Sequence, residues 1–231
     1  MKRILMVMTS HQDLMNTDSK TGLWIGEFAD PYYEFIDQGY EIVLASPLGG
    51  KPPIDPLSKL TENITASNRR FTEDEVAKKA LSETRLLEEV EASEFDAVFF
   101  PGGHGPLFDL ANSDICGQLI LDFYKQKKPI AAVCHGPAAL IKAVELEPAI
   151  LKGKRVTGFS DAEEKLVFRE NNIPFTVENR LVWLGGDYHN AVIPFSSHVE
   201  QDGLLITGQN PLSAVPAAKT LIELLEARTD S

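Results

Sequence analysis

The sequence contains only two cysteines among 231 residues. Two are too few for the disulfide framework that stabilises many secreted domains. The first apolar run, residues 4–8, is shorter than the apolar core of a signal peptide, and the polar residues 9–11 follow it at once. We therefore expect a cytoplasmic protein, in which a cysteine can remain a free thiol.

Basic charge is also scarce. Lys and Arg number 22 against 34 Asp and Glu, which gives a formal net charge of −12, and the longest basic run is Arg69-Arg70. Nucleic acids and anionic membranes are bound through clusters of Lys and Arg, so we expect neither as a partner. No apolar stretch approaches the roughly 20 residues that cross a bilayer.

Several nucleotide and metal motifs are missing. The sequence has no P-loop, and the glycine-rich run at residues 102–106 lacks the spacing of a dinucleotide-binding G-x-G-x-x-G motif. His11, His104, His189 and His198 do not follow the ligand spacing of a known zinc site. We therefore expect no cofactor and no bound metal.

Apolar strands alternate with amphipathic helices along the chain. This pattern predicts one α/β domain over residues 1–231, with a flavodoxin-like, doubly wound, mainly parallel sheet and helices on both faces. A proline-rich segment at 47–70 is expected to form a lid over the site. Residues 175–184 fit either a helix or a strand. The predicted strands are 3–8, 40–45, 95–100, 130–133 and 155–159, with a hairpin of 198–201 and 204–207. The predicted helices are 30–38, 72–90, 112–127, 138–144, 161–171 and 213–228, followed by a frayed tail at 229–231.

Cys134 stands where the apolar run 130–133 ends and a helix beginning near Pro137 follows. A sharp strand-to-helix turn of this kind is typical of a nucleophile elbow. The N-terminal end of a helix favours a thiolate, so we expect a lowered pKa for this thiol. A small buried hydrophobic side chain is the alternative interpretation. Cys116 falls inside a predicted helix, and we expect it to contribute to packing.

His135, next to Cys134, requires a carboxylate to orient its ring. Asp161, Glu163 and Glu164 are the candidates, although acids at a helix N-terminus are also common for electrostatic reasons alone. The N–H groups of Gly102, Gly103 and His135 can form an oxyanion hole, although a Pro-Gly-Gly sequence is also an ordinary tight turn.

Taken together, these motifs resemble the ThiJ/PfpI group of the class I glutamine amidotransferase-like superfamily. The chain is most similar to its small stress-response branch, described as glutathione-independent glyoxalase III, to which holdase chaperone and protein deglycase activities are also attributed. The resemblance rests on five segments that extend from the first strand to the last helix. They are residues 132–137, 101–105, 21–27, 157–161 and 202–211.

The resemblance implies roles for individual residues. Cys134 corresponds to the nucleophile, His135 to its partner and Glu27 to a buried glutamate beside the thiol. Glu164 aligns best with the third member of the triad, with Glu163 next to it. Gly103, His104 and Trp24 correspond to oxyanion-hole or substrate-binding positions, and the family is expected to form homodimers.

The function that the resemblance implies is a cofactor-free lyase acting on small 2-oxoaldehydes, with methylglyoxal converted to lactate through a cysteine hemithioacetal. We expect burial and a neighbouring thiolate to keep Glu27 protonated. The alternatives are a stress-responsive redox sensor, a holdase chaperone or a protein deglycase. A cysteine peptidase or amidase is a third choice, which a lid at 47–70 disfavours because peptides require an open cleft.

Overall fold

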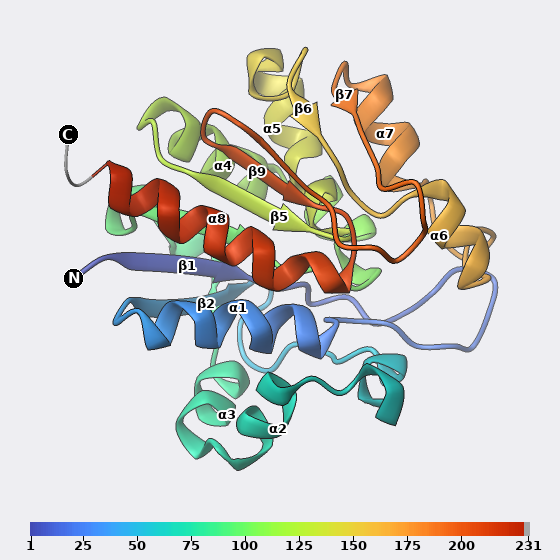
Figure 1. Ribbon diagram of the computed structural model, residues 1–231, viewed down its shortest axis with the longest axis horizontal. Coiled ribbons are helices and arrows are strands. Elements are labelled where there is room, and N and C mark those ends of the chain that lie inside the picture. Colours follow the sequence, from blue (N-terminus) through green and yellow to red (C-terminus); the bar gives the residue numbers. More distant parts are fainter. Residues whose placement is uncertain (229–231) are drawn as a thin grey trace.

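A seven-stranded sheet forms the centre of the computed structural model, which describes residues 1–228 (Figure 1). The strand order is β3-β2-β1-β4-β5-β9-β8. All neighbouring strands are parallel except β8 and β9, which are antiparallel. The strands are β1 (Arg3–Val7), β2 (Glu41–Ser46), β3 (Arg85–Leu86), β4 (Ala97–Phe100), β5 (Ile130–Val133), β8 (Val199–Asp202) and β9 (Leu205–Gly208). The predicted mainly parallel sheet is therefore confirmed, as is the hairpin at its edge.

Helices cover both faces of this sheet, because each inner strand is apolar on both sides. In β1, Ile4 and Met6 point into the core beneath α1 and α8, whereas Leu5 and Val7 point into the core beneath α4 and α5. Figure 1 shows α1 and α8 lying side by side across one face. The helices are α1 (Ile25–Asp37), α2 (Ala66–Glu73), α3 (Glu75–Ser82), α4 (Asp114–Lys125), α5 (Leu140–Leu146), α6 (Asp161–Leu166), α7 (Val177–Trp183) and α8 (Ala214–Ala227).

The first helix begins earlier than the sequence predicts. We expected Asp30 and Pro31 to open it, but α1 starts at Ile25 and contains Pro31. The backbone N–H of Trp24 donates to the carbonyl of Gly102 at 3.1 Å, which anchors the helix start beside β4. As a result, the first turn of α1 carries Glu27 into the interior.

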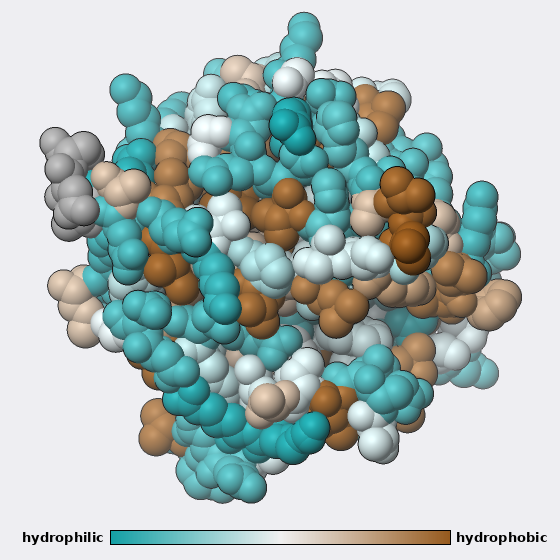
Figure 2. All heavy atoms as spheres, in the orientation of Figure 1, coloured by the Kyte–Doolittle hydropathy of each residue, from teal (hydrophilic) through white to brown (hydrophobic). Residues whose placement is uncertain are grey.

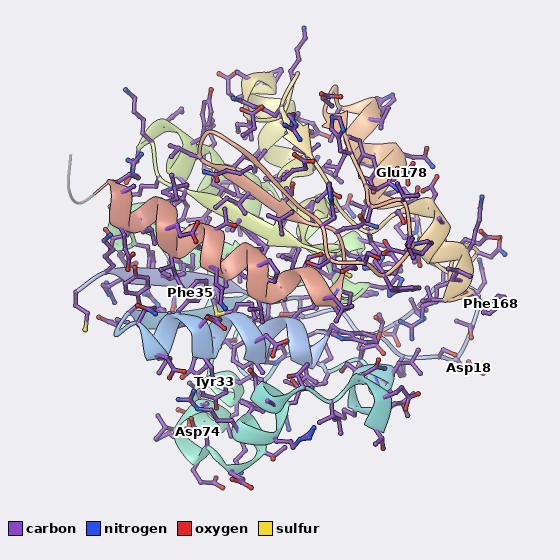
Figure 3. All side chains as sticks on the ribbon, in the orientation of Figure 1. Asp18, Tyr33, Phe35, Asp74, Phe168 and Glu178 are labelled. Carbon is purple, nitrogen blue, oxygen red and sulfur yellow. The ribbon has the colours of Figure 1, made fainter. Side chains whose placement is uncertain are left out.

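The predicted helix 72–90 is confirmed only in part, by α3 over 75–82, and is wrong at both ends. Asp74 ends α2 and caps α3 by accepting the Ala77 N–H, and the chain then becomes extended as the edge strand β3. The hydroxyl of Tyr33 on α1 donates to Asp74 at 3.0 Å. Figure 3 labels both residues where α1 faces the α2–α3 pair. The sequence pattern missed this break because the polar side chain of Asp74 serves as a cap.

The predicted strand 155–159 is also wrong as part of the main sheet. Only Arg155–Val156 (β6) is a strand, and it pairs with β7 (Asp187–Tyr188) in a separate two-stranded sheet. The N–H of Phe159 donates to the carbonyl of Cys134 at 2.9 Å, so this segment packs against the elbow instead of extending the sheet.

The remaining differences concern the edges of the fold. The ambiguous residues 175–184 contain helix α7, and α6 is shorter than the helix predicted over 161–171. The frayed tail predicted for 229–231 lies outside the described residues. Within 1–228, no helix combines the length and apolar character needed to cross a membrane.

Candidate active site

Cys134 occupies a sharp turn between β5 and the 3-10 turn Gly136–Ala139. Its φ of 60° is in the left-handed region, which a residue other than glycine adopts only when its surroundings hold it there. Its N–H donates to Gly208 and its carbonyl accepts from Phe159, both at 2.9 Å. Hydrogen bonds on both sides thus hold the thiol at the carboxyl end of the central strand.

Glu27 is fully buried beside this turn. Its Oε2 accepts the Gly102 N–H at 2.8 Å, whereas its Oε1 has no hydrogen-bond partner among the described residues. Burial raises the pKa of Glu27 to about 8, so the carboxyl carries a proton at neutral pH. The Gly102 N–H is therefore engaged with Glu27 and is not available for the predicted oxyanion hole.

The expected lowering of the thiol pKa is wrong. Burial, together with the negative charge of Glu27 when it ionises, raises the pKa of Cys134 well above its ordinary value, although the Gly103 N–H donates to the sulfur. The side chain is almost completely buried. A 3-10 turn of four residues has a much smaller dipole than a full helix, so desolvation outweighs it.

His135 lies between the thiol and a carboxylate. Its Nδ1 is 3.2 Å from Sγ of Cys134, and its Nε2 donates to Oε2 of Glu164 at 2.7 Å. Since Nε2 carries the hydrogen toward Glu164, Nδ1 is free to accept the thiol proton.

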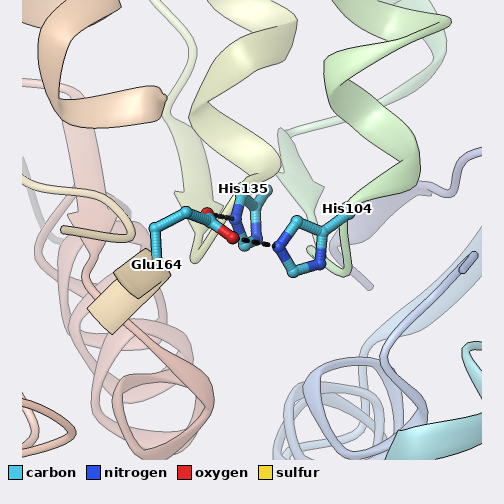
Figure 4. A group of neighbouring side chains, drawn as sticks. All are labelled: His104, His135 and Glu164. Atoms are coloured by element: carbon cyan, nitrogen blue, oxygen red, sulfur yellow. Dashed lines mark hydrogen bonds and ion pairs between the residues drawn. The ribbon is translucent and has the colours of Figure 1, made fainter. Parts of the chain in front are cut away.

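Glu164 receives two imidazole donors. His104 donates from Nε2 to Oε1 at 2.6 Å, so each carboxylate oxygen is bonded to a histidine (Figure 4). Burial opposes ionisation, but the two histidines hold the pKa of Glu164 below its ordinary range. Of the three candidate acids, Glu164 is the one bonded to His135.

The other two candidates have structural partners. Glu163 forms a capping box with Ser160, and its Oε1 accepts from the Phe195 N–H and the Asn210 side chain. Asp161 accepts from Asn179 at the start of α6.

A second buried pair, Arg169 and Asp55, extends this network, and no sequence motif indicates it. Nη1 of Arg169 donates to Asp55 at 2.6 Å and to Nδ1 of His104 at 3.1 Å. The Thr21 hydroxyl donates to the same oxygen of Asp55 at 2.9 Å. Burial and the adjacent His135 lower the pKa of His104 to about 4, so His104 is neutral with both ring nitrogens engaged. Its role as a substrate-binding residue stays a prediction.

His104, His135 and Glu164 also form the group of potential metal ligands found among residues 1–228, with donor atoms within 4.8 Å of one another. His11, His189 and His198 are not part of it. The donor atoms of the group are hydrogen-bonded to each other, and the guanidinium of Arg169 contacts His104. A cation placed here would have to displace these bonds beside an existing positive charge.

A cavity of about 610 Å³ opens above the thiol. Trp24, Gly103, His104 and His135 border it near Cys134, and residues 57–65 of the predicted lid segment form one wall. Gly103 has φ 90°, and a Cβ there would lie 2.0 Å from the Gly22 carbonyl oxygen, so only glycine allows this loop to approach so closely. In Figure 2, hydrophobic side chains gather beyond the N-terminal end of α8.

Comparison with known proteins gives consistent matches. A sequence model described as the DJ-1/PfpI family matches residues 26–224. The chain is 29% identical over 235 residues to the glutathione-independent glyoxalase HSP31 of Saccharomyces cerevisiae, covering 97% of this chain and 98% of that protein. The crystal structure of glyoxalase III from Candida albicans superposes with a TM-score of 0.86 at 27% identity, covering 96% and 97% of the two chains. The Rapid Encystment Protein 24 KDa of Francisella tularensis gives a TM-score of 0.91 at 40% identity, covering 97% and 99%.

Proposed function

We propose, from the premise that this chain belongs to the DJ-1/PfpI family, that it is a glutathione-independent glyoxalase. It converts 2-oxoaldehydes such as methylglyoxal to 2-hydroxy acids in defence against reactive carbonyl compounds. The family resemblance indicated by the sequence motifs is confirmed. The observation that carries the proposal is the placement of Cys134 beside His135 and the buried Glu27 at the floor of the cavity.

The first step is formation of a hemithioacetal. Sγ of Cys134 attacks the aldehyde carbon C1, and Nδ1 of His135 takes the thiol proton across 3.2 Å and passes it to the aldehyde oxygen. Because the pKa of the thiol is raised, proton removal must accompany the attack instead of preceding it. The His135 N–H remains as a candidate donor for the developing oxyanion, whereas the Gly103 N–H donates to the sulfur before the attack.

The second step moves hydrogen from C1 to C2. His135, neutral again, removes the C1 proton while Glu27 gives its proton to the C2 oxygen, which forms an enediol. Glu27 then takes the proton from the C1 hydroxyl, and His135 returns its proton to C2. Carbon C1 is thus oxidised and C2 reduced without an external redox partner. Glu27 must begin protonated, which its raised pKa provides.

The third step releases the product. A water molecule deprotonated by His135 attacks the thioester, and the thiolate leaves and regains its proton from the imidazolium. Glu164, held ionised by its two histidine partners, stabilises the imidazolium in each step at which His135 is charged. The products are the 2-hydroxy acid and the original enzyme.

The site supports a small substrate better than a peptide. The thiol lies at the floor of a cavity with residues 57–65 along one wall, which favours a small aldehyde over an extended peptide. A redox sensor would use the thiol, but it would not need the acid–base partners assembled around it. Homodimer formation and a cytoplasmic location stay predictions.

The test is turnover of methylglyoxal in buffer free of glutathione, measured as lactate formed by the wild type, Cys134→Ser and Cys116→Ser. Cys116 is the matched control because it is also buried and, on α4, does not line the cavity. We expect Cys134→Ser to lose at least about 10³-fold in kcat, as nucleophile removal does elsewhere, and Cys116→Ser to retain activity. Unchanged turnover by Cys134→Ser would overturn the proposed function.

A further inference from the structure

The cavity is much larger than methylglyoxal requires. Cavities of about 300–1,000 Å³ take drug-sized ligands, and this one measures about 610 Å³. Methylglyoxal bound to Cys134 would fill only the floor, because its methyl group is its entire side chain. The remaining volume therefore points to a substrate with a longer substituent.

The walls above the thiol are mainly apolar and come from several segments that are distant in sequence. Leu60 and Leu212 line the cavity from two of these segments and are 44% and 64% exposed. Apolar side chains that are exposed at a cavity mouth favour a ligand that removes them from water. The apolar lining residues are Leu57, Leu60, Ile64, Phe159, Val167, Phe195, Pro211, Leu212 and Val215.

The charges around the cavity disfavour an anionic substituent. The guanidinium of Arg169 is already bonded to Asp55 and His104. Asp30 and Glu62 add carboxylates to the lining. A phosphate or carboxylate on the substrate would meet repulsion without gaining a cationic partner.

We propose that the preferred substrates are neutral 2-oxoaldehydes with an apolar tail, which lies against Leu60 and Leu212 while C1 reacts with Cys134. This inference rests on the glyoxalase function proposed above. Each buried methylene contributes about fourfold to binding. A tail with three further carbons should therefore raise kcat/KM over methylglyoxal by at least about tenfold.

Two substrates with six carbons provide the test. 2-Oxohexanal has an apolar tail, whereas 3-deoxyglucosone carries hydroxyl groups on a tail of the same length. We expect kcat/KM to be highest for 2-oxohexanal, with methylglyoxal and 3-deoxyglucosone at least about tenfold lower. Methylglyoxal turnover with no preference for 2-oxohexanal would overturn this inference alone. Turnover of none of the three would overturn the proposed function.

Substitutions of Leu60 and Leu212 test whether these residues contact the apolar tail of the substrate. Leu60→Asn and Leu212→Asn should each lower kcat/KM for 2-oxohexanal about fivefold more than kcat/KM for methylglyoxal. Leu146→Asn is the matched control, because Leu146 is 57% exposed on α5 and does not line the cavity. Equal effects on both substrates, or an equal effect of the control, would contradict the assignment of these residues to the tail.

A different observation supports a second inference, about the protonation of His104. Nδ1 of His104 faces a guanidinium, which can only donate, so Nδ1 must be the unprotonated nitrogen. The ring hydrogen therefore resides on Nε2, where it is donated to Glu164. The opposite tautomer would direct a lone pair at the carboxylate and leave two donors facing each other at Arg169.

We infer that Arg169 is a positioning residue that fixes the tautomer of His104. Asp55 holds Arg169 in place. With its tautomer fixed, His104 keeps Glu164 ionised beside His135. Arg169 acts through His104 and Glu164 and does not react itself. The bonds involved are all buried, with Arg169 8% and Asp55 0% exposed. Water therefore cannot readily replace the lost donor when Arg169 is removed.

The test is nitrogen-15 NMR of His104 with steady-state kinetics in the wild type, Arg169→Met and Arg169→Lys. We expect a single Nε2-protonated tautomer in the wild type and a mixture in Arg169→Met. kcat should fall about tenfold in Arg169→Met, part of the roughly 10²–10⁴-fold that an acid–base group contributes, with KM for methylglyoxal within about twofold. Arg169→Lys should restore the tautomer and most of kcat.

A single Nε2 tautomer in Arg169→Met, or a kcat loss that Arg169→Lys does not reverse, would overturn the inference. Arg169→Met leaves Asp55 buried without its partner and can fail to fold. The paired variant Asp55→Asn with Arg169→Met removes both charges together. It is expected to show the same tautomer mixture and the same kcat loss.

Discussion

Glu27 and Glu164 are both buried glutamates of the candidate active site, yet at neutral pH Glu27 is protonated and neutral whereas Glu164 is ionised. Glu27 has one backbone N–H donor and no cation, so burial dominates and its pKa rises to about 8. Glu164 has two imidazole donors, which outweigh burial and lower its pKa. The comparison shows that the partners of a buried carboxyl, and not burial itself, decide its role.

Replacing Glu27 by a residue that cannot transfer a proton should lower kcat more than any other substitution of a carboxyl group in the site. In Glu27→Gln the amide can still accept the Gly102 N–H, but it cannot transfer a proton between the substrate oxygens. We expect kcat to fall about 10³-fold, while Cys134 remains open to alkylation near neutral pH. Steady-state kinetics and iodoacetamide labelling measure the two properties on the same sample. Full turnover by this variant would remove Glu27 from the acid–base chemistry.

Removing the charge of Glu164 should lower kcat less than the Glu27 substitution does. Glu164→Gln can accept from one histidine only and cannot stabilise the imidazolium, so we expect kcat to fall about 10²-fold. Asp161→Asn is the matched control on the same helix, and we expect it to remain within about twofold of the wild type. If Asp161→Asn matched Glu164→Gln, the effect would belong to α6 and not to the carboxylate.

The pH dependence of activity separates the two carboxyls further. Glu27 must be protonated at the start of the hydrogen transfer, so kcat should fall as pH rises above about 8, by about tenfold per pH unit for loss of one proton. The residual activity of Glu27→Gln should lack this alkaline decline. A decline at the same pH in Glu27→Gln would assign it to another group, such as the thiol.

The contributions of Glu27 and Glu164 to the free energy of unfolding should change with pH in opposite directions. Unfolding lowers the pKa of Glu27 from about 8 to near its ordinary value of 4.5, so the folded state binds the extra proton between these values. Its contribution to the free energy of unfolding therefore decreases by about 1.4 kcal/mol per pH unit as pH rises through this window. Glu164 has a lowered pKa, so its stabilisation is present above pH 4.5 and is lost as pH falls below it.

Urea unfolding from pH 3 to 9 measures both slopes, and Glu27→Gln and Glu164→Gln assign them. We expect Glu27→Gln to flatten the curve above pH 5 and Glu164→Gln to flatten it below. Identical curves for the wild type and Glu27→Gln would show that Glu27 ionises normally in the folded protein.

Much of this site follows from local sequence. The apolar run of β5 that ends at Cys134 places the thiol at the sheet edge, and the motif containing Glu27 identifies its buried carboxyl. Ser160 to Glu164 begins a helix, but the one-residue choice between Glu163 and Glu164 depends on which side chain α6 turns toward His135. That rotation is decided by tertiary packing, through the bonds of Glu163 to Phe195 and Asn210.

Other features could not be predicted from local sequence. Asp55 and Arg169 are 114 residues apart, and neither stands in a recognisable pattern. The thiol pKa was predicted in the wrong direction, because the sequence indicates a helix start but not the burial that outweighs it. The break at Asp74 was missed because a capping aspartate inside a helical pattern resembles an ordinary surface acid.

The most direct measurement is a carbon-13 NMR titration of the glutamate side-chain carboxyls, with the two resonances assigned through Glu27→Gln and Glu164→Gln. We predict that the Glu27 resonance titrates near pH 8, while the Glu164 resonance stays that of a carboxylate down to the pH at which the protein unfolds. An ionised Glu27 at pH 7, or a Glu164 that titrates near its ordinary value, would contradict it.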